Sequence, residues 1–296
     1  MERSEAMRRA VFFGAAAIGA LVLSGGCVGE GAGGAGGGGA WRAVDVVDAM
    51  RVNDKGVSTR EVSYEDGGVE LGGFYAFGEG VDGERPAVLI VHEWWGHNEY
   101  ARERARELAG LGYAAFALDM YGEGVLAETA ERAGALATPF YRDRALMRSR
   151  ARAGLEAMLA QGEVDGDRVA VIGYCFGGTV ALELARSGAA LDAAVSFHGG
   201  LSTPDAGDAE NITGTVMVAN GAADPLVPMD ERRAFIEEME SAGVDYLFVE
   251  HGGALHSFTN PAADGLGMDG VGYDPAADAR SWRQMLMLFN EVFGEG

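Results

Sequence analysis

Apolar and polar residues follow two patterns along this chain. From about residue 57 onward, short apolar runs alternate with longer stretches in which apolar residues recur at helical spacing. Short continuous runs are typical of strands buried on both faces, and the longer stretches are typical of helices with one apolar face. We therefore predict an α/β fold with a mostly parallel central sheet and helices on both of its faces.

The folded part opens with a different pattern. Residues 58–64 and 69–77 alternate between apolar and polar side chains, and Asp66-Gly67-Gly68 separates them, which predicts an antiparallel hairpin. Further strands are predicted at 87–91, 113–118, 168–172, 191–197, 214–220 and 244–249. Helices are predicted at 100–111, 143–161, 177–186, 230–242 and 278–293. No insertion between these elements is long enough for a large cap domain.

The first 26 residues have the pattern of an export signal. Arg8 and Arg9 precede an uncharged apolar run over residues 10–23, which is short for a membrane span and ends in small residues. Cys27 then resembles the lipid-modified cysteine of bacterial lipoproteins. We predict a signal peptide over 1–26 and a lipid anchor at Cys27; the alternative is an ordinary cleaved signal beside an incidental cysteine.

A flexible tether is predicted after the signal. Residues 29–39 are almost entirely glycine and alanine, a composition that cannot bury enough surface to fold. We assign residues 27–56 to the tether and 57–296 to a catalytic domain. The protein is then expected to be exported, either to the periplasm or to a membrane as a lipoprotein.

Charge and cysteine content narrow the possible partners. The 296-residue chain has 45 acidic against 23 basic side chains and a net charge of −22. Such a charge disfavours nucleic acid and anionic membrane surfaces, so membrane contact is expected only through Cys27. The 2 cysteines are Cys27 and Cys175, and acylation of the first excludes a disulfide framework. The sequence does not fix the oligomeric state, for which a monomer is expected.

The strongest chemical signal is a thiol in a tight turn. The apolar run 168–172 leads into Gly173-Tyr174-Cys175-Phe176-Gly177-Gly178, which predicts a strand that turns sharply into a helix. This is the pattern of the α/β-hydrolase nucleophile elbow, with Cys175 in place of the usual serine. Small residues flank the nucleophile because the strained turn leaves no room for larger ones. The alternative, an inert buried cysteine, does not need these glycines.

A base and an acid follow in the order that α/β-hydrolases use. Asp224 comes just after the strand at 214–220, and His256 lies on the loop before the last helix. Both then lie at the carboxyl ends of strands, where ligands bind in such sheets. Asp224 taken alone could merely cap a turn with Pro225, and His251 is a rival base five residues before His256. Jointly, Cys175, Asp224 and His256 predict a catalytic triad.

Two backbone N–H groups are predicted to form an oxyanion hole. One belongs to Phe176, directly after the nucleophile, and the other to Trp94, in the loop after the strand at 87–91. Glu93 lies beside this site, where it could restrain the thiol in its neutral form until substrate arrives. A structural role for Glu93, through a hydrogen bond that fixes the loop, is the alternative.

These residues together resemble the dienelactone hydrolase family of the α/β-hydrolase superfamily over roughly residues 57–295. The resemblance rests on four segments: 92–96 (HEWWG), 118–122 (LDMYG), 173–178 (GYCFGG) and 253–258 (GALHSF). It implies a single-domain hydrolase with a Cys-His-Asp triad and with neither a metal nor an organic cofactor. It also implies that the glutamate at position 93 hydrogen-bonds the resting thiol and moves aside when substrate binds.

Two departures from the family bear on the substrate. Family members that act on dienelactone hold its carboxylate with two arginines, at positions where this chain has Glu123 and Asn260. An acidic residue disfavours an anionic substrate, although Arg142 or Arg144 could compensate. A neutral ester or lactone is therefore expected as the small-molecule substrate. The predicted pocket residues are Trp95, Tyr121, Glu123, Phe258 and Asn260.

The sequence thus predicts a hydrolase that cleaves carboxylic ester or lactone bonds through a thioester acyl-enzyme. A non-catalytic binding protein on the same fold is one alternative, and a peptidase of the same fold is the other. Loss of a triad member would favour the binding protein, but all three residues are present.

Overall fold

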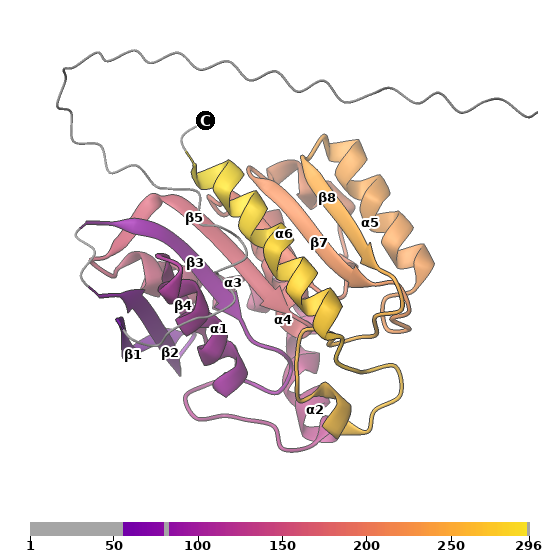
Figure 1. Cartoon of the computed structure of the whole chain (residues 1–296), viewed down its shortest axis with the longest axis horizontal. Coiled ribbons are helices and arrows are strands. Elements are labelled where there is room, and N and C mark those ends of the chain that lie inside the picture. Colours follow the sequence, from indigo (N-terminus) through magenta and orange to yellow (C-terminus); the bar gives the residue numbers. More distant parts are fainter. Residues whose placement is uncertain (1–55, 80–82, 295–296) are drawn as a thin grey trace, which may run out of the picture. The chain divides into compact units, whose positions relative to one another are not determined.

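A single eight-stranded sheet organises the part of the chain that the computed structural model describes, residues 56–79 and 83–294. The strands lie in the order β1-β2-β4-β3-β5-β6-β7-β8 (Figure 1). Their bounds are β1 Val57–Asp66, β2 Val69–Gly78, β3 Arg85–Val91, β4 Ala114–Leu118, β5 Val164–Tyr174, β6 Ala193–Phe197, β7 Thr215–Gly221 and β8 Tyr246–His251. Each strand predicted from the sequence is present, with ends that differ by a few residues.

The sheet is parallel except at one edge. β1 pairs with β2 and β2 pairs with β4 in antiparallel register, whereas β4, β3, β5, β6, β7 and β8 are mutually parallel. The predicted hairpin is confirmed, and its turn uses Gly67 and Gly68, which both have positive φ. Because the central strands are parallel, their carboxyl ends share one edge of the sheet, and the loops that follow them meet there.

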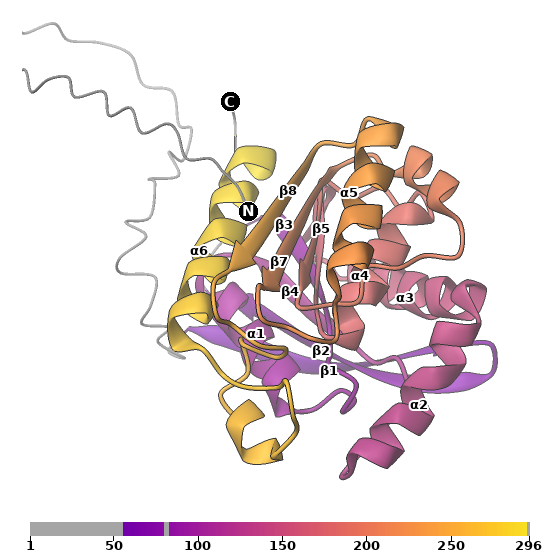
Figure 2. The same cartoon turned by 90° about the vertical axis from the view of Figure 1, so that its right-hand side faces the viewer.

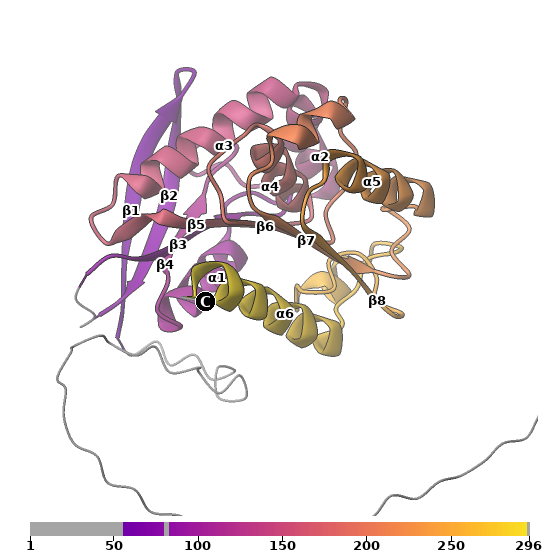
Figure 3. The ribbon, with the colours of Figure 1, turned by 90° about the horizontal axis from the view of Figure 1, so that it is seen from above.

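Helices cover both faces of the sheet, as the short apolar strands predict. α1 and α6 lie on one face, and α3, α4 and α5 lie on the other (Figure 3). The helices are α1 Glu99–Gly110, α2 Ala130–Arg142, α3 Arg144–Leu159, α4 Phe176–Arg186, α5 Met229–Ala242 and α6 Pro275–Phe293. β3 and β4 are buried along their whole length, because helices cover both of their faces.

The sequence analysis missed one helix, α2. It begins after Thr129, whose side chain accepts a hydrogen bond from the Arg132 amide, and it contains Pro139. Its buried residues are few, namely Ala133, Ala137 and Phe140, and a proline inside a segment argues against a helix there. Figure 2 shows α2 at the same end of the sheet as the short 3₁₀ turn η2 (Ala263–Leu266) that precedes α6. α2 therefore adds to the wall around the carboxyl ends of the strands.

The signal peptide, the tether and the lipid anchor at Cys27 all fall outside the described residues. Within the described part of the chain, none of the helices combines the length and the apolar character that a membrane crossing requires. No large cap domain interrupts the described elements either. The described helices and strands all fall within residues 57–296, the range that the sequence predicts as the catalytic domain.

Candidate active site

Cys175 occupies the sharp turn between β5 and α4. Its backbone has φ 54° and ψ −116°, a conformation that residues with a side chain rarely adopt. The turn is possible because its neighbours are glycines. A Cβ atom on Gly173 would lie 1.9 Å from the carbonyl oxygen of Gly177, and one on Gly177 would lie 2.3 Å from that of Val91. The half-buried thiol is thus fixed at the N-terminus of α4, where the helix dipole favours negative charge.

In the predicted triad, His256 contacts both Cys175 and Asp224. Nε2 of His256 lies 3.1 Å from Sγ of Cys175, and Nδ1 of the same ring lies 2.8 Å from Oδ2 of Asp224. Asp224 and His256 are 3% and 7% exposed, so little water competes for these bonds. A thiol, an imidazole and a carboxylate in this arrangement can deprotonate the thiol and hold the imidazole in one orientation.

Local structure fixes both partners of the thiol. Oδ1 of Asp224 accepts a hydrogen bond from the Leu226 amide at 2.8 Å, which leaves Oδ2 for the imidazole. The backbone of His256 is held on both sides, by bonds to Gly270 O and from Gly272 N. His251, the alternative base, lies at the end of β8 with its ring against Phe258. Of the two histidines, it is His256 that reaches the sulfur.

The electrostatics of the pair favour a proton on the imidazole. Burial disfavours the charged form of His256, but the Cys175 sulfur and the Asp224 carboxylate favour it more strongly. Together they raise the pKa of His256 to about 10. A protonated imidazole in contact with the sulfur would stabilise the negative charge of a thiolate, which is the nucleophilic form of a cysteine.

The predicted oxyanion amides come from two neighbouring elements. Phe176 is the first residue of α4, so its N–H is among those that no carbonyl of the helix can accept. Trp94 follows β3, and its carbonyl oxygen accepts a hydrogen bond from the Tyr121 hydroxyl at 3.1 Å. That bond fixes the loop after β3 against the aromatic group of Tyr121, Phe140 and Phe176.

The contacts of Glu93 differ from those that the family resemblance implies. Its carboxylate accepts hydrogen bonds from Ser257 Oγ at 3.0 Å and from Asn260 Nδ2 at 2.6 Å. The hydrogen bond of the Cys175 sulfur runs to His256 instead. The expectation of a Glu93–thiol bond is therefore corrected for this structure. The contacts of Glu93 match the alternative, a carboxylate that fixes the neighbouring loop.

Three of the predicted pocket residues lie elsewhere. Phe258 is 0% exposed, with its ring against His198 and His251, because it belongs to the core beneath α6. Asn260 is 6% exposed and bonds to Glu93, so it is a buried support. Glu123 is exposed on the surface beside Gly72 of β2. Tyr121 and Trp95 are half-buried; Tyr121 packs on Phe176, next to the nucleophile, and Trp95 packs on Trp94.

Sequence reasoning missed His198, which follows β6. Its Nδ1 accepts a hydrogen bond from the Cys175 amide at 3.1 Å, and its Nε2 lies 2.7 Å from Thr259 Oγ1. The ring is 0% exposed, and burial is the main reason that the pKa of His198 is well below the usual value for histidine. Its place directly after a predicted strand was the available signal, because every other polar site residue follows a strand.

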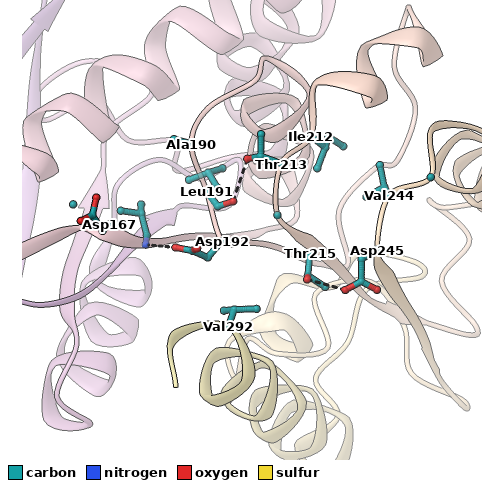
Figure 4. Close-up of a pocket in the computed structure, with 14 residues that line it drawn as sticks. Asp167, Ala190, Leu191, Asp192, Ile212, Thr213, Thr215, Val244, Asp245 and Val292 are labelled. Atoms are coloured by element: carbon teal, nitrogen blue, oxygen red, sulfur yellow. Dashed lines mark hydrogen bonds between the residues drawn. The ribbon is translucent and has the colours of Figure 1, made fainter. Parts of the chain in front are cut away.

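A separate hollow lies at the opposite edge of the sheet (Figure 4). It has a volume of about 730 Å³ and is lined by the residues at the amino ends of β6 and β7 together with Asp167 and Asp245. Polar groups that line the hollow are hydrogen-bonded to one another. Asp192 accepts a hydrogen bond from the Val169 amide, and the Thr215 hydroxyl donates one to Asp245. In the described part of the chain, no group of three or more His, Cys, Asp or Glu is arranged to hold a metal ion.

A parallel sheet with a nucleophile elbow and with acid and histidine beyond it defines the α/β-hydrolase class. Within that class the chain belongs to the dienelactone hydrolase family, which matches residues 72–293. It is a hydrolase of that family, as the four sequence segments indicate.

The chain is similar to the following three known proteins. The solved structure of a dienelactone hydrolase-like promiscuous phosphotriesterase from metagenomic libraries is 46% identical, with a TM-score of 0.78 over 80% of this chain and 99% of that one. A "Putative carboxymethylenebutenolidase" of Aquifex aeolicus is 29% identical, over 77% of this chain and 96% of its own length. A "Probable 2-oxo-3-(5-oxofuran-2-ylidene)propanoate lactonase" of Bradyrhizobium is 25% identical, over 70% and 84%.

Proposed function

We propose that this hydrolase cleaves uncharged carboxylic esters or lactones, with Cys175 as nucleophile, His256 as acid and base, and Asp224 orienting the imidazole. One observation carries the proposal: a single imidazole bridges the thiol of a nucleophile elbow, at 3.1 Å, and a buried carboxylate, at 2.8 Å. A protein that only bound ligands would not require this series of contacts.

The first half of the reaction forms a thioester. The Cys175 thiolate attacks the carbonyl carbon, a C–S bond forms, and the carbonyl electron pair moves to oxygen. The resulting oxyanion accepts hydrogen bonds from the Phe176 and Trp94 amides. As the intermediate collapses, the C–O bond to the alcohol breaks, and the His256 imidazolium donates its Nε2 proton to the departing oxygen. The acyl group remains on the sulfur.

Water completes the cycle. His256, now neutral, takes a proton from a water molecule, and the hydroxide oxygen attacks the thioester carbon. A second oxyanion forms at the same two amides and collapses by breaking the C–S bond. The carboxylic product leaves, and the thiolate–imidazolium pair is restored. Asp224 stabilises the imidazolium in both halves without taking the proton itself.

The charges around the site favour an uncharged substrate. Neither Glu123, on the surface, nor Asn260, bonded to Glu93, supplies the positive charge that the family uses to hold a carboxylate. Arg144 lies 3.9 Å from Glu183 and donates to the carbonyl oxygen of Ser202, so it is already engaged. Rings of Tyr121 and Tyr141 pack on Phe176 and offer an apolar surface beside the nucleophile.

A neutral phosphotriester is a second candidate substrate. The relative that is 46% identical is named as a promiscuous phosphotriesterase. A triester carries no charge that Glu93 or Glu123 would repel. Its P=O oxygen could accept hydrogen bonds from the same two backbone N–H groups as the ester oxyanion. In that reaction the thiolate would attack phosphorus and expel an alcohol, leaving a phosphoryl group on sulfur for hydrolysis.

The test compares para-nitrophenyl butyrate, a dialkyl para-nitrophenyl phosphate and a peptide para-nitroanilide as substrates of the full-length protein. We expect ester turnover that disappears in Cys175→Ala and His256→Ala, while circular dichroism shows the fold unchanged. Ester turnover retained in either variant would overturn the proposed mechanism. Cleavage of the anilide alone would favour the peptidase, and binding of esters without turnover would favour the binding protein.

Export and a lipid anchor at Cys27 are part of the proposal, and they rest on the sequence of residues 1–27. A catalytic domain on an anchored tether would meet substrates outside the cytoplasm. Mass spectrometry of the mature N-terminus tests this. A diacylglyceryl group on Cys27 is expected, and an unmodified N-terminus at another residue would contradict the anchor.

A further inference from the structure

We propose that Arg232, near the start of α5, is a positioning residue that holds the Asp224 carboxylate against the His256 imidazole. The proposal rests on the proposed triad and adds to it a residue that touches none of the reacting atoms. Arg232 acts through the loop that carries the acid.

That loop has little regular structure of its own. It runs from the end of β7 at Gly221 to Pro228, which directly precedes α5. Residues 222–228 belong to neither a helix nor a strand. A backbone of this kind lacks the repeating hydrogen bonds that would fix it, so its position depends on bonds to neighbouring elements. The direction of the Asp224 carboxylate then depends on what holds the loop.

The guanidinium of Arg232 is hydrogen-bonded along the whole length of this loop. Its N–H groups donate to the carbonyl oxygens of four loop residues at 2.7 to 3.4 Å, namely Gly221, Ala222, Asp224 and Val227. A fifth bond goes to Glu250 Oε1 of β8, at 2.5 Å. A guanidinium has five N–H groups in a rigid fork, so this arrangement uses all of them.

Burial makes these bonds difficult to replace. Arg232 is 4% exposed and Asp224 is 3% exposed. Because so little water reaches the loop, a carbonyl oxygen that loses the guanidinium has few other donors, and the loop must move to find one. The Glu250 side chain is 39% exposed, so its ion pair balances the charge of the arginine without burying a second charge completely.

A movement of the loop would act directly on the imidazole. Asp224 is bonded on two sides, because its backbone carbonyl oxygen accepts from Arg232 at 3.0 Å and its Oδ2 lies 2.8 Å from His256 Nδ1. A displacement of about 1 Å would take the second contact beyond the range of a hydrogen bond between nitrogen and oxygen. The imidazole would then lose the partner that orients it.

Titratable groups face His256 from several elements. Burial lowers its pKa, whereas Cys175 at the elbow and Asp224 after β7 raise it. His198, after β6, has its ring 5.4 Å from that of His256, and burial keeps its pKa well below the usual value, so it stays neutral. Glu93, after β3, is buried and close enough to interact with the charge of His256. Among these groups, it is Asp224 that lies on the loop held by the α5 guanidinium.

Arg232→Met tests the proposal in the full-length protein, because methionine fills the space of the arginine stem and has no donors. With an alkyl ester as substrate, we expect kcat per iodoacetamide-titrated active site to fall about a hundredfold while KM changes less than about threefold. The alkaline limb of kcat should move to lower pH, since a displaced Asp224 raises the pKa of His256 less. A residue that only stabilises the fold would lower the amount of active protein and leave the limb in place.

A double-mutant cycle shows whether Arg232 acts through the acid. In Asp224→Asn the carboxylate has already been removed, so adding Arg232→Met should lower kcat by no more than about twofold further. A further loss of about a hundredfold in that background would overturn the proposal, because the arginine would then act on another part of the site.

Two further variants guard the interpretation. Arg232→Lys keeps the charge but donates from a single nitrogen, so it should lower kcat by about tenfold, and it replaces Arg232→Met if that variant does not fold. Arg233→Met is the matched control, since it removes the same charge from the next, exposed position of α5. It should keep the kcat and the alkaline limb of the parent protein. An equal loss in Arg233→Met and Arg232→Met would overturn the proposal.

Alkylation of Cys175 by iodoacetamide at pH 7 separates this proposal from the proposed function, because it needs no ester. An imidazole without its carboxylate partner stabilises a thiolate less, so Arg232→Met and Asp224→Asn should each react about tenfold more slowly than the parent protein. The double variant should react no more slowly than Asp224→Asn. That result without ester turnover in the parent protein would contradict the proposed function and support the positioning role. Alkylation and kcat within about twofold of the parent in both Arg232 variants would overturn the positioning role.

Discussion

The backbone amide of Cys175 donates a hydrogen bond to Nδ1 of His198, at 3.1 Å. The same amide also lies 3.0 Å from the carbonyl oxygen of Phe197. Because Nδ1 is the acceptor, the ring proton of the neutral imidazole is on Nε2, which bonds to Thr259 Oγ1 at 2.7 Å. Thr259 lies three residues after His256, so His198 connects the nucleophile turn to the loop that carries the proposed base.

We predict that His198→Phe lowers kcat for ester hydrolysis by about tenfold and leaves KM nearly unchanged, because a displacement at the nucleophile affects the transition state more than substrate binding. Thr259→Val preserves the shape of the side chain and removes only the hydroxyl, and it should have a smaller effect in the same direction. Steady-state kinetics with para-nitrophenyl butyrate measure both.

A purely structural role for His198 would give another result. In that case both variants would lower the unfolding temperature and the amount of active protein, while kcat per titrated active site stayed the same. Active-site titration by iodoacetamide consumption, together with thermal unfolding, separates these outcomes.

The raised pKa of His256 predicts the alkaline limit of activity. The leaving group takes its proton from the imidazolium, so kcat should fall as pH rises through a value near 10, the pKa of His256. Asp224→Asn removes one of the groups that raise this pKa, and the alkaline limb should move to lower pH. The measurement is kcat against pH for an ester with a poor, alkyl leaving group, which depends most on the acid.

The same shift has a consequence for stability. The pKa of His256 is higher in the folded protein than in the unfolded chain, so protonation of His256 stabilises the fold. This contribution is complete below the unfolded pKa of about 6.5 and is lost as the pH rises to about 10. Urea unfolding at pH 6 and pH 10 should therefore show a larger loss of stability in the parent protein than in His256→Ala. An equal loss in both would contradict the assignment of the shift.

Much of this site was predictable from the sequence, because its signals are local. Cys175 is marked by glycines that a steric argument explains, and Asp224 and His256 each follow a strand that its own apolar run identifies. The structure shows the same steric limit, with Gly177 against the carbonyl oxygen of Val91. The order of strands and helices was predictable for the same reason.

The rest depends on contacts between distant segments, which periodicity does not encode. Asn260 was assigned to the pocket by its position in the family pattern, but its amide bonds to Glu93, 167 residues earlier in the chain. Phe258 adjoins the site in sequence and points into the core. α2 was missed because its buried face is small and its interior contains Pro139. Which polar groups pair, and which way a side chain points, can be learned only from the three-dimensional structure.

A buried ion pair behind the nucleophile helix should be a large contributor to stability. Arg186 of α4 is fully buried and makes two bonds to Glu238 of α5, at 2.7 and 2.8 Å, besides one to Glu183. Arg186→Leu would leave the buried Glu238 carboxylate without its ion-pair partner, whereas Glu183 would keep its bond to Arg148, and the cost should be about 3 to 5 kcal/mol. Arg102→Leu, which removes an ion pair to the exposed Glu61, should cost about 1 kcal/mol or less. Urea denaturation measures both, and similar losses would contradict the account of burial.

Gly177→Ala is the most direct test of the nucleophile elbow, the turn between β5 and α4. In a helix this exchange normally stabilises by about 0.5 to 1 kcal/mol. Here the added Cβ atom would lie 2.3 Å from the Val91 carbonyl oxygen and 2.7 Å from that of His92, closer than such atoms can approach. The first turn of α4 must then move away from β3, at a cost of about 1 to 3 kcal/mol, and Cys175 and the Phe176 amide move with it. We therefore expect lower stability and at least a hundredfold lower kcat.

Gly252→Ala is the control, because nothing lies within 4 Å of the Cβ position there. Should Gly177→Ala be as stable and active as Gly252→Ala, the close approach of α4 to β3 would not be what holds the nucleophile in place.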